Sequence, residues 1–120
     1  MSRTALATLT AMVAAVSLML AGAVLAAPAK VVGTVGPGHT ITLKLGGKRV
    51  TKLKAGTYRF VVSDRSDEHD FRVVGPGVSR VLTSEEFIGT KSVVLTLKKG
   101  SYRYFCAPHA DMMRGAFKVA

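Results

Sequence analysis

Residues 102–117 read YRYFCAPHADMMRGAF, and they bring together the chain's one cysteine, one of its three histidines and two of its five methionines. A soft thiolate, an imidazole and a thioether this close together suit copper better than a hard, oxygen-seeking cation. Pro108 cannot continue a strand ladder, so we expect the strand that ends at Cys106 to turn there and to place His109 beside the sulfur. The residues after the methionines then return the chain to a closing strand.

Most of the chain from Lys30 onward alternates apolar and polar residues with a period of two, which predicts strands with one buried and one wet face. The residues predicted to face inward in the clearest runs are Ile41, Leu43 and Leu45, then Tyr58, Phe60 and Val62, then Val93, Leu95 and Leu97. Turns rich in Gly and Pro separate the runs, and residues 83–86 could form one capped helical turn at most. The pattern predicts an all-β fold, an antiparallel Greek-key β-sandwich of about seven strands.

The same alternation predicts which way the candidate metal ligands point. Along residues 102–106 the even positions share a face, so Cys106 is expected to point into the core with the two tyrosines before it. Along residues 69–73 the odd positions share a face, so His69 is expected to point into the same interior. His39 lies in a Gly-Pro-Gly-His-Thr turn, is expected to lie far from any other donor, and is assigned a structural role.

The order strand, Cys, Pro-His, Met, one residue, Gly and strand in residues 102–117 resembles the copper-binding loop of the cupredoxins, the family of plastocyanin, pseudoazurin, amicyanin and azurin. In that family the remaining ligand is a histidine upstream, near the start of a strand, and His69 occupies that place. The resemblance implies a cupredoxin-like sandwich that holds one type 1 copper ion through His69, Cys106, His109 and, weakly, Met113.

Two features of the family pattern need separate treatment, which are the choice between two adjacent methionines and an aspartate in place of a common asparagine. Met112 has the shorter spacing from the loop histidine that amicyanin shows, but the position of Gly115 favours Met113 as the axial ligand. Asp70 stands where relatives commonly have the Asn that ties the two ligand-bearing loops together by hydrogen bonds. A carboxylate can accept such bonds but cannot donate them unless it is protonated. We therefore expect the ligands to be in place, with an altered rigidity and reduction potential.

Residues 1–26 read as a secretory signal peptide, because Arg3 precedes an apolar run that ends in small residues suited to cleavage near Ala26. The run is also long enough for an uncleaved membrane anchor, although no basic stop-transfer cluster follows it. We expect a domain at residues 27–120 that is exported to the periplasm, the cell envelope or the extracellular space. In such an oxidising compartment a lone cysteine has no internal disulfide partner, which favours a metal-binding role.

The formal net charge of the chain is +10, and about +9 remains without Arg3. A basic exported protein is suited to an acidic redox partner or an anionic envelope polymer, whereas lysines on strand faces also keep a β-protein soluble and block edge pairing. Nucleic acid is a poor partner for an exported chain.

The resemblance implies a monomeric carrier of single electrons between redox partner proteins, and not an enzyme. Two alternatives stay open, which are a copper-binding or delivery protein without redox turnover and a metal-free β-sandwich that binds a partner or polymer. Zinc also accepts the same nitrogen and sulfur donors.

Overall fold

The computed structural model describes residues 15, 17 and 26–120. The signal peptide predicted at residues 1–26 therefore lies almost wholly outside the described residues. Within the described part, no helix has the length and hydropathy that crossing a bilayer requires.

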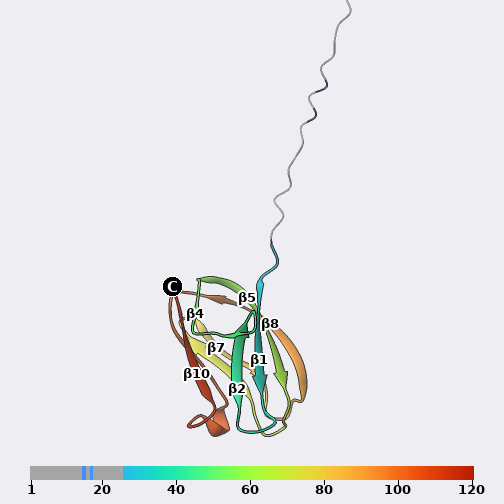
Figure 1. Cartoon of the computed structure of the whole chain (residues 1–120), viewed down its shortest axis with the longest axis vertical. Coiled ribbons are helices and arrows are strands. Elements are labelled where there is room, and N and C mark those ends of the chain that lie inside the picture. Colours follow the sequence, from blue (N-terminus) through green and yellow to red (C-terminus); the bar gives the residue numbers. More distant parts are fainter. Residues whose placement is uncertain (1–14, 16, 18–25) are drawn as a thin grey trace, which may run out of the picture.

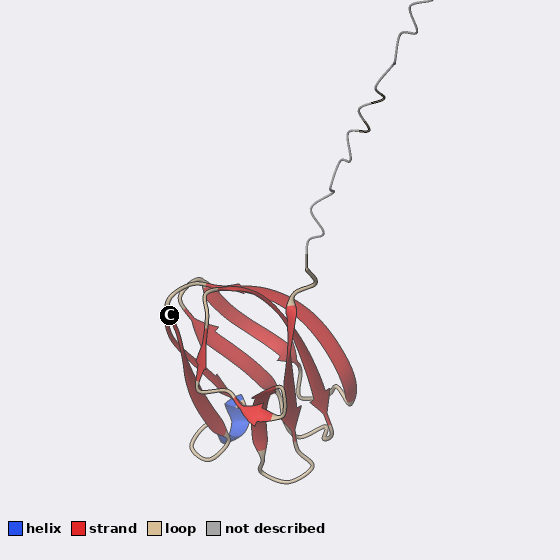
Figure 2. Ribbon diagram, turned by 45° about the horizontal axis from the view of Figure 1, so that its top comes forward, coloured by secondary structure: helices blue, strands red, loops and turns tan. Residues whose placement is uncertain are grey.

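The described residues form two packed β-sheets with a single turn of 3₁₀ helix, η1 (Ala107–His109), at one end (Figures 1 and 2). One sheet has the strand order β3-β2-β1-β5-β8 and the other has the order β4-β10-β9-β6-β7. The strands are β1 (Ala29–Val35), β2 (Ile41–Leu45), β3 (Lys48–Arg49), β4 (Lys52–Leu53), β5 (Gly56–Asp64), β6 (Phe71–Gly75), β7 (Val78–Thr83), β8 (Gly89–Leu97), β9 (Gly100–Phe105) and β10 (Arg114–Val119). The predicted all-β sandwich is confirmed.

The sheets are mixed, because β1 runs parallel to β5 and β4 runs parallel to β10, while the other strand pairs are antiparallel. Alternation of apolar and polar residues has the same period in both kinds of ladder, so it carries no information on strand direction. The strand count also exceeds the predicted number, since β3 and β4 are two residues long and too short to show any alternation.

The core lies between the two sheets and follows the predicted parity. Tyr58, Phe60 and Val62 on β5 are buried, as are Leu95 and Leu97 on β8. The prediction is wrong for Leu45, which is 38% exposed at the end of β2. There β2 pairs only with the two-residue edge strand β3, so little chain is available to cover that side chain.

The hairpin of β9 and β10 is fixed by a glycine placed opposite an aromatic ring. Gly115 pairs directly with Tyr104, and a Cβ atom at Gly115 would overlap the ring of that tyrosine. Tyr104 in turn stacks on Phe71 of β6, with ring centroids 5.8 Å apart. The glycine therefore lets the ring cover the strand and pack toward the β6 side of the core.

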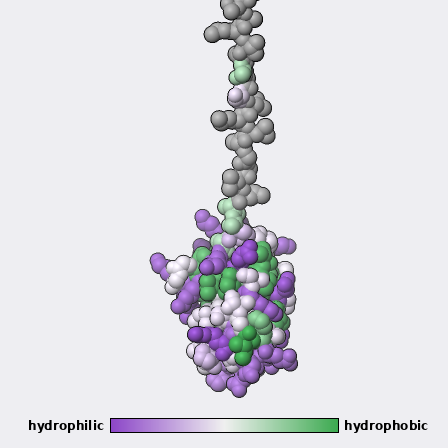
Figure 3. Space-filling model, turned by 90° about the vertical axis from the view of Figure 1, so that its right-hand side faces the viewer, coloured by the Kyte–Doolittle hydropathy of each residue, from purple (hydrophilic) through white to green (hydrophobic). Residues whose placement is uncertain are grey.

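Basic residues lie on the outer faces of both sheets. Lys30, Lys44 and Arg59 belong to one sheet, and Arg72, Arg103 and Arg114 belong to the other. Figure 3 shows hydrophilic side chains around much of one flank, with smaller apolar areas between them. The positive charge is therefore spread over the domain, which fits a role in solubility as well as one in binding an acidic partner.

Candidate metal centre

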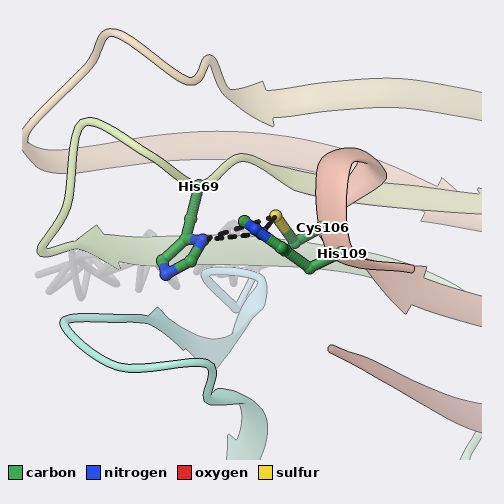
Figure 4. A group of neighbouring side chains, drawn as sticks. All are labelled: His69, Cys106 and His109. Carbon is green, nitrogen blue, oxygen red and sulfur yellow. Dashed lines mark hydrogen bonds between the residues drawn. The ribbon is translucent and has the colours of Figure 1, made fainter. Parts of the chain in front are cut away.

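Three side chains from two distant parts of the chain converge at one end of the sandwich (Figure 4). His69 lies in the connection between β5 and β6, Cys106 follows β9, and His109 ends η1. The two Nδ1 atoms of His69 and His109 are 3.2 Å apart. The Sγ atom of Cys106 lies 3.7 Å from Nδ1 of His69 and 3.6 Å from Nδ1 of His109.

These three atoms form a nearly equilateral triangle of the size that one metal ion needs. A point equidistant from atoms at these separations lies about 2.0 Å from each, which is the length of a bond between imidazole nitrogen and a divalent metal. Two nitrogens and one thiolate sulfur are the donors of a trigonal copper site. The residues that are present therefore fit a copper ion.

The sharp turn predicted at Pro108 is confirmed, and it brings His109 back to the cysteine. Cys106 precedes η1 in an extended conformation, and the N–H of His109 donates to the carbonyl oxygen of Cys106 at 3.1 Å. Proline fits the first turn of a helix, where its missing N–H would have no partner. The tight turn thus places both donors on the same side of the loop.

The loop then closes on itself through the backbone of Met113. The N–H of Met113 donates to the carbonyl oxygen of His109 at 2.8 Å, and the N–H of Cys106 donates to the carbonyl oxygen of Met113 at 3.0 Å. Met113 is fully buried in the same core cluster as Cys106, whereas Met112 is 60% exposed. Met113 is therefore the one of the two methionines whose side chain packs inside the core beside Cys106.

The ligand candidates differ in how far they are exposed to solvent. His69 and Cys106 are 1% and 0% exposed, as their strand parity predicts, whereas His109 is only partly buried. An ion in the triangle would be shielded from water on the core side and accessible mainly past His109.

Asp70 connects the two loops that carry the triangle. It is buried, and its Oδ1 atom accepts the N–H of Ala107 at 2.7 Å while its Oδ2 atom accepts the Nε–H of Arg72 at 2.7 Å. The carboxylate thus makes the connection by accepting a hydrogen bond, as the chemistry of its oxygens allows. Arg72 offsets the buried negative charge from its half-exposed position.

Burial raises the pKa of the Cys106 thiol, and backbone hydrogen bonds from Asp70 and His109 to the sulfur act in the opposite direction. In the metal-free protein the thiol therefore keeps its proton at neutral pH. A thiolate is the form that binds metal, so metal binding must displace that proton.

A second carboxylate, Asp64 at the end of β5, is also buried. Its Oδ1 atom accepts the N–H of Ser66 at 3.3 Å, and its Oδ2 atom has no partner. Burial raises the pKa of Asp64 above the ordinary carboxyl value.

The structure contradicts the assignment of His39 to a place far from the other donors. Its ring centroid lies 4.6 Å from that of His109 and 5.5 Å from that of His69, with edge-to-face geometry in both pairs. The β1–β2 loop folds over the end of the sandwich, and a Cβ atom at Gly36 would lie 3.2 Å from Cδ2 of His69. Convergence of separate loops depends on sheet topology, which local spacing does not reveal.

Comparison with known proteins agrees with this architecture and chemistry. The profile of copper binding proteins of the plastocyanin/azurin family matches residues 30–120. No curated protein sequence matches the chain significantly. The fold is similar to that of the copper protein rusticyanin, with a TM-score of 0.54, 18% identity and 76% of each chain covered. It is also similar to auracyanin A, a "blue" copper protein from the green thermophilic photosynthetic bacterium Chloroflexus aurantiacus, with a TM-score of 0.52, 18% identity and coverage of 78% of this chain and 100% of the other.

Proposed function

The chain belongs to the plastocyanin/azurin family of copper-binding proteins, and from that premise we propose that it is an exported type 1 copper protein that carries single electrons between redox partners. Its cofactor is one copper ion. In this proposal His69, Cys106 and His109 are the three strong ligands and Met113 is the weak axial ligand. The observation that carries the proposal is the triangle of donor atoms with sides of 3.2, 3.6 and 3.7 Å.

Bound copper supplies a one-electron couple, and the protein's task is to keep the ligands still while the charge of the ion changes. A trigonal set of two imidazoles and a thiolate with a distant thioether suits both oxidation states. The backbone bonds between Cys106, His109 and Met113 hold three of the four donors in one small loop. The stacked rings of Phe71 and Tyr104 keep the core side of the site apolar and dry.

His109 is the proposed point of exchange for the electron. It is the only one of the four proposed ligands with partial solvent access, since His69, Cys106 and Met113 are buried. A partner that docks on this end of the sandwich would contact the imidazole of His109. The surplus of basic residues supports a partner with an acidic surface.

We infer a carrier and not an enzyme, because four protein donors leave no open position at the ion for a substrate. Export rests on the signal-like composition of residues 1–26, which places the domain in the periplasm, the cell envelope or the extracellular space.

Voltammetry together with a copper-transfer assay tests this function against copper delivery. A carrier should show a reversible one-electron wave and keep its copper through repeated reduction and oxidation. It should also release Cu(I) slowly to an added chelator. Rapid loss of Cu(I) on reduction, without a reversible wave, would identify a delivery protein and refute the carrier role.

A further inference from the structure

Three imidazoles gather at the end of the sandwich where an ion must enter. The ring centroids of His39, His69 and His109 are separated by 4.6, 4.9 and 5.5 Å. An imidazole bound through nitrogen has its ring centre about 3 Å from the metal, so two rings on one ion lie no more than about 6 Å apart. All three pairs fall within that range. His39 is therefore close enough to share an ion with either of the other two rings.

Exposure falls steadily from the surface to the proposed site. His39 is exposed, His109 is partly buried, and His69, Cys106 and Met113 are buried. An incoming hydrated ion meets His39 and His109 before it can reach the thiol. Imidazole binds Cu(II) well, so these two histidines can hold the ion before it reaches the buried donors.

His39 is nevertheless not a ligand of the completed site. The group of donor atoms that lie within 4.8 Å of one another consists of His69, Cys106 and His109. With Met113 as the fourth donor, the ion would have no coordination position left for His39. His39 is thus an exposed imidazole that lies beside the candidate site but is not among its four proposed ligands.

We propose that His39 captures Cu(II) at the surface together with His109, and then releases it inward to the buried ligands; this inference rests on the proposed type 1 site. The transfer is a ligand exchange in which the bond from copper to His39 breaks as the bond to the Cys106 sulfur forms. The thiol proton leaves to water, and copper stays in the same oxidation state. The ring of an exposed histidine turns easily about its outer torsion, so the edge-to-face packing against His109 does not prevent capture.

The growth of thiolate absorption after anaerobic mixing of the copper-free protein with Cu(II) measures the loading rate. In the native protein the rate should saturate with copper concentration, because capture precedes transfer. His39→Phe keeps an aromatic ring but removes both nitrogens, and it should load about tenfold more slowly at low copper, with the final spectrum unchanged. Thr40→Val, at the exposed neighbouring position, is the matched control and should load at the native rate. Equal rates in the native protein and His39→Phe would overturn the proposal.

A second measurement isolates the capture step. In Cys106→Ser the transfer cannot be completed, so Cu(II) should remain on the histidines, and adding His39→Phe should raise the dissociation constant for Cu(II) about tenfold. An unchanged constant would also overturn the proposal. Failure of the type 1 site itself would look different, because the native protein would then develop no thiolate absorption at any rate.

Discussion

Replacing Asp70 by Asn removes a buried negative charge beside the proposed copper ligands while keeping the shape of the side chain. The amide oxygen of Asn can still accept the N–H of Ala107, so the connection between the two loops is retained. The amide NH₂ then takes the place of Oδ2 and cannot accept the Nε–H of Arg72, so that hydrogen bond is lost. Because that arginine is 41% exposed, the cost in stability should be about 1 kcal/mol or less.

The expected effect is a higher reduction potential, since a nearby negative charge stabilises Cu(II) over Cu(I). Asp70 adjoins His69 and contacts the residue after Cys106, and we take the separation between its carboxylate and an ion held by both as on the order of 7 Å. With an effective dielectric constant of about 20, a unit charge at that distance contributes about 2.4 kcal/mol, or about 100 mV for one electron. Arg72 would turn toward solvent in the variant and withdraw part of its own positive potential. The net rise should be about 50 to 100 mV.

Voltammetry of the copper-loaded proteins measures this shift. Asp67→Asn removes an exposed carboxylate from the same loop and serves as the control, because solvent should screen its charge to a change of about 10 mV or less. Asp70→Asn should keep the thiolate absorption band, which shows that the ligands have not moved. A potential that is unchanged or lower in Asp70→Asn would refute the role assigned to this charge.

Three other variants test the axial ligand, the β9–β10 hairpin and the second buried carboxylate. Met113→Leu should raise the reduction potential and keep the visible band, because a hydrocarbon donates no electron density to Cu(II). The exposed Met112→Leu should leave both the potential and the band unchanged, and equal potentials in the two variants would refute the assignment of Met113. Gly115→Ala should lower the free energy of unfolding, measured in urea, by about 1 to 3 kcal/mol, because the new Cβ atom overlaps the ring of Tyr104. Gly38→Ala, with open space around it, should change that free energy by no more than about 0.5 kcal/mol, and similar losses in both variants would contradict the steric role of Gly115. Burial raises the pKa of Asp64 in the folded state, so the folded protein binds this proton more tightly than the unfolded chain does, and the free energy of unfolding falls as pH rises through the ordinary carboxyl pKa. Asp64→Asn should therefore gain stability relative to the native protein between about pH 3 and pH 7. Parallel stability profiles over this pH range would exclude that effect.

Alternation along the chain was sufficient to predict the burial of Cys106 and His69, because the two residues continue the inward-facing rows of β9 and β6. The burial of Met113 and the exposure of Met112 follow from the register of the hairpin. Gly115 must lie opposite Tyr104 for the hairpin to close, and this register leaves Met113 inside the core and Met112 outside.

Other features depend on which loops meet, and local pattern does not contain that information. His39 reaches the centre because the β1–β2 loop covers the same end of the sandwich as the two ligand-bearing loops. Asp70 is buried although it sits at an even position, because it precedes the strand and the loop after β9 lies against it. Strand parity extended beyond the strand end therefore holds for His69 but not for Asp70, and it says nothing of the approach of His39 to the other histidines.

Absorption and EPR spectra of the protein after copper addition test the central claim most directly, with Cys106→Ser as the comparison. We predict one copper ion per chain, an intense visible band from a copper–thiolate bond and a Cu(II) EPR signal that reduction by one electron removes. The visible band should be absent in Cys106→Ser, and Cu(II) held on the histidines of that variant should give an EPR signal that differs from that of the copper–thiolate site. A native protein that binds no copper, or one whose Cys106 still reacts with a thiol reagent after copper is added, would contradict it.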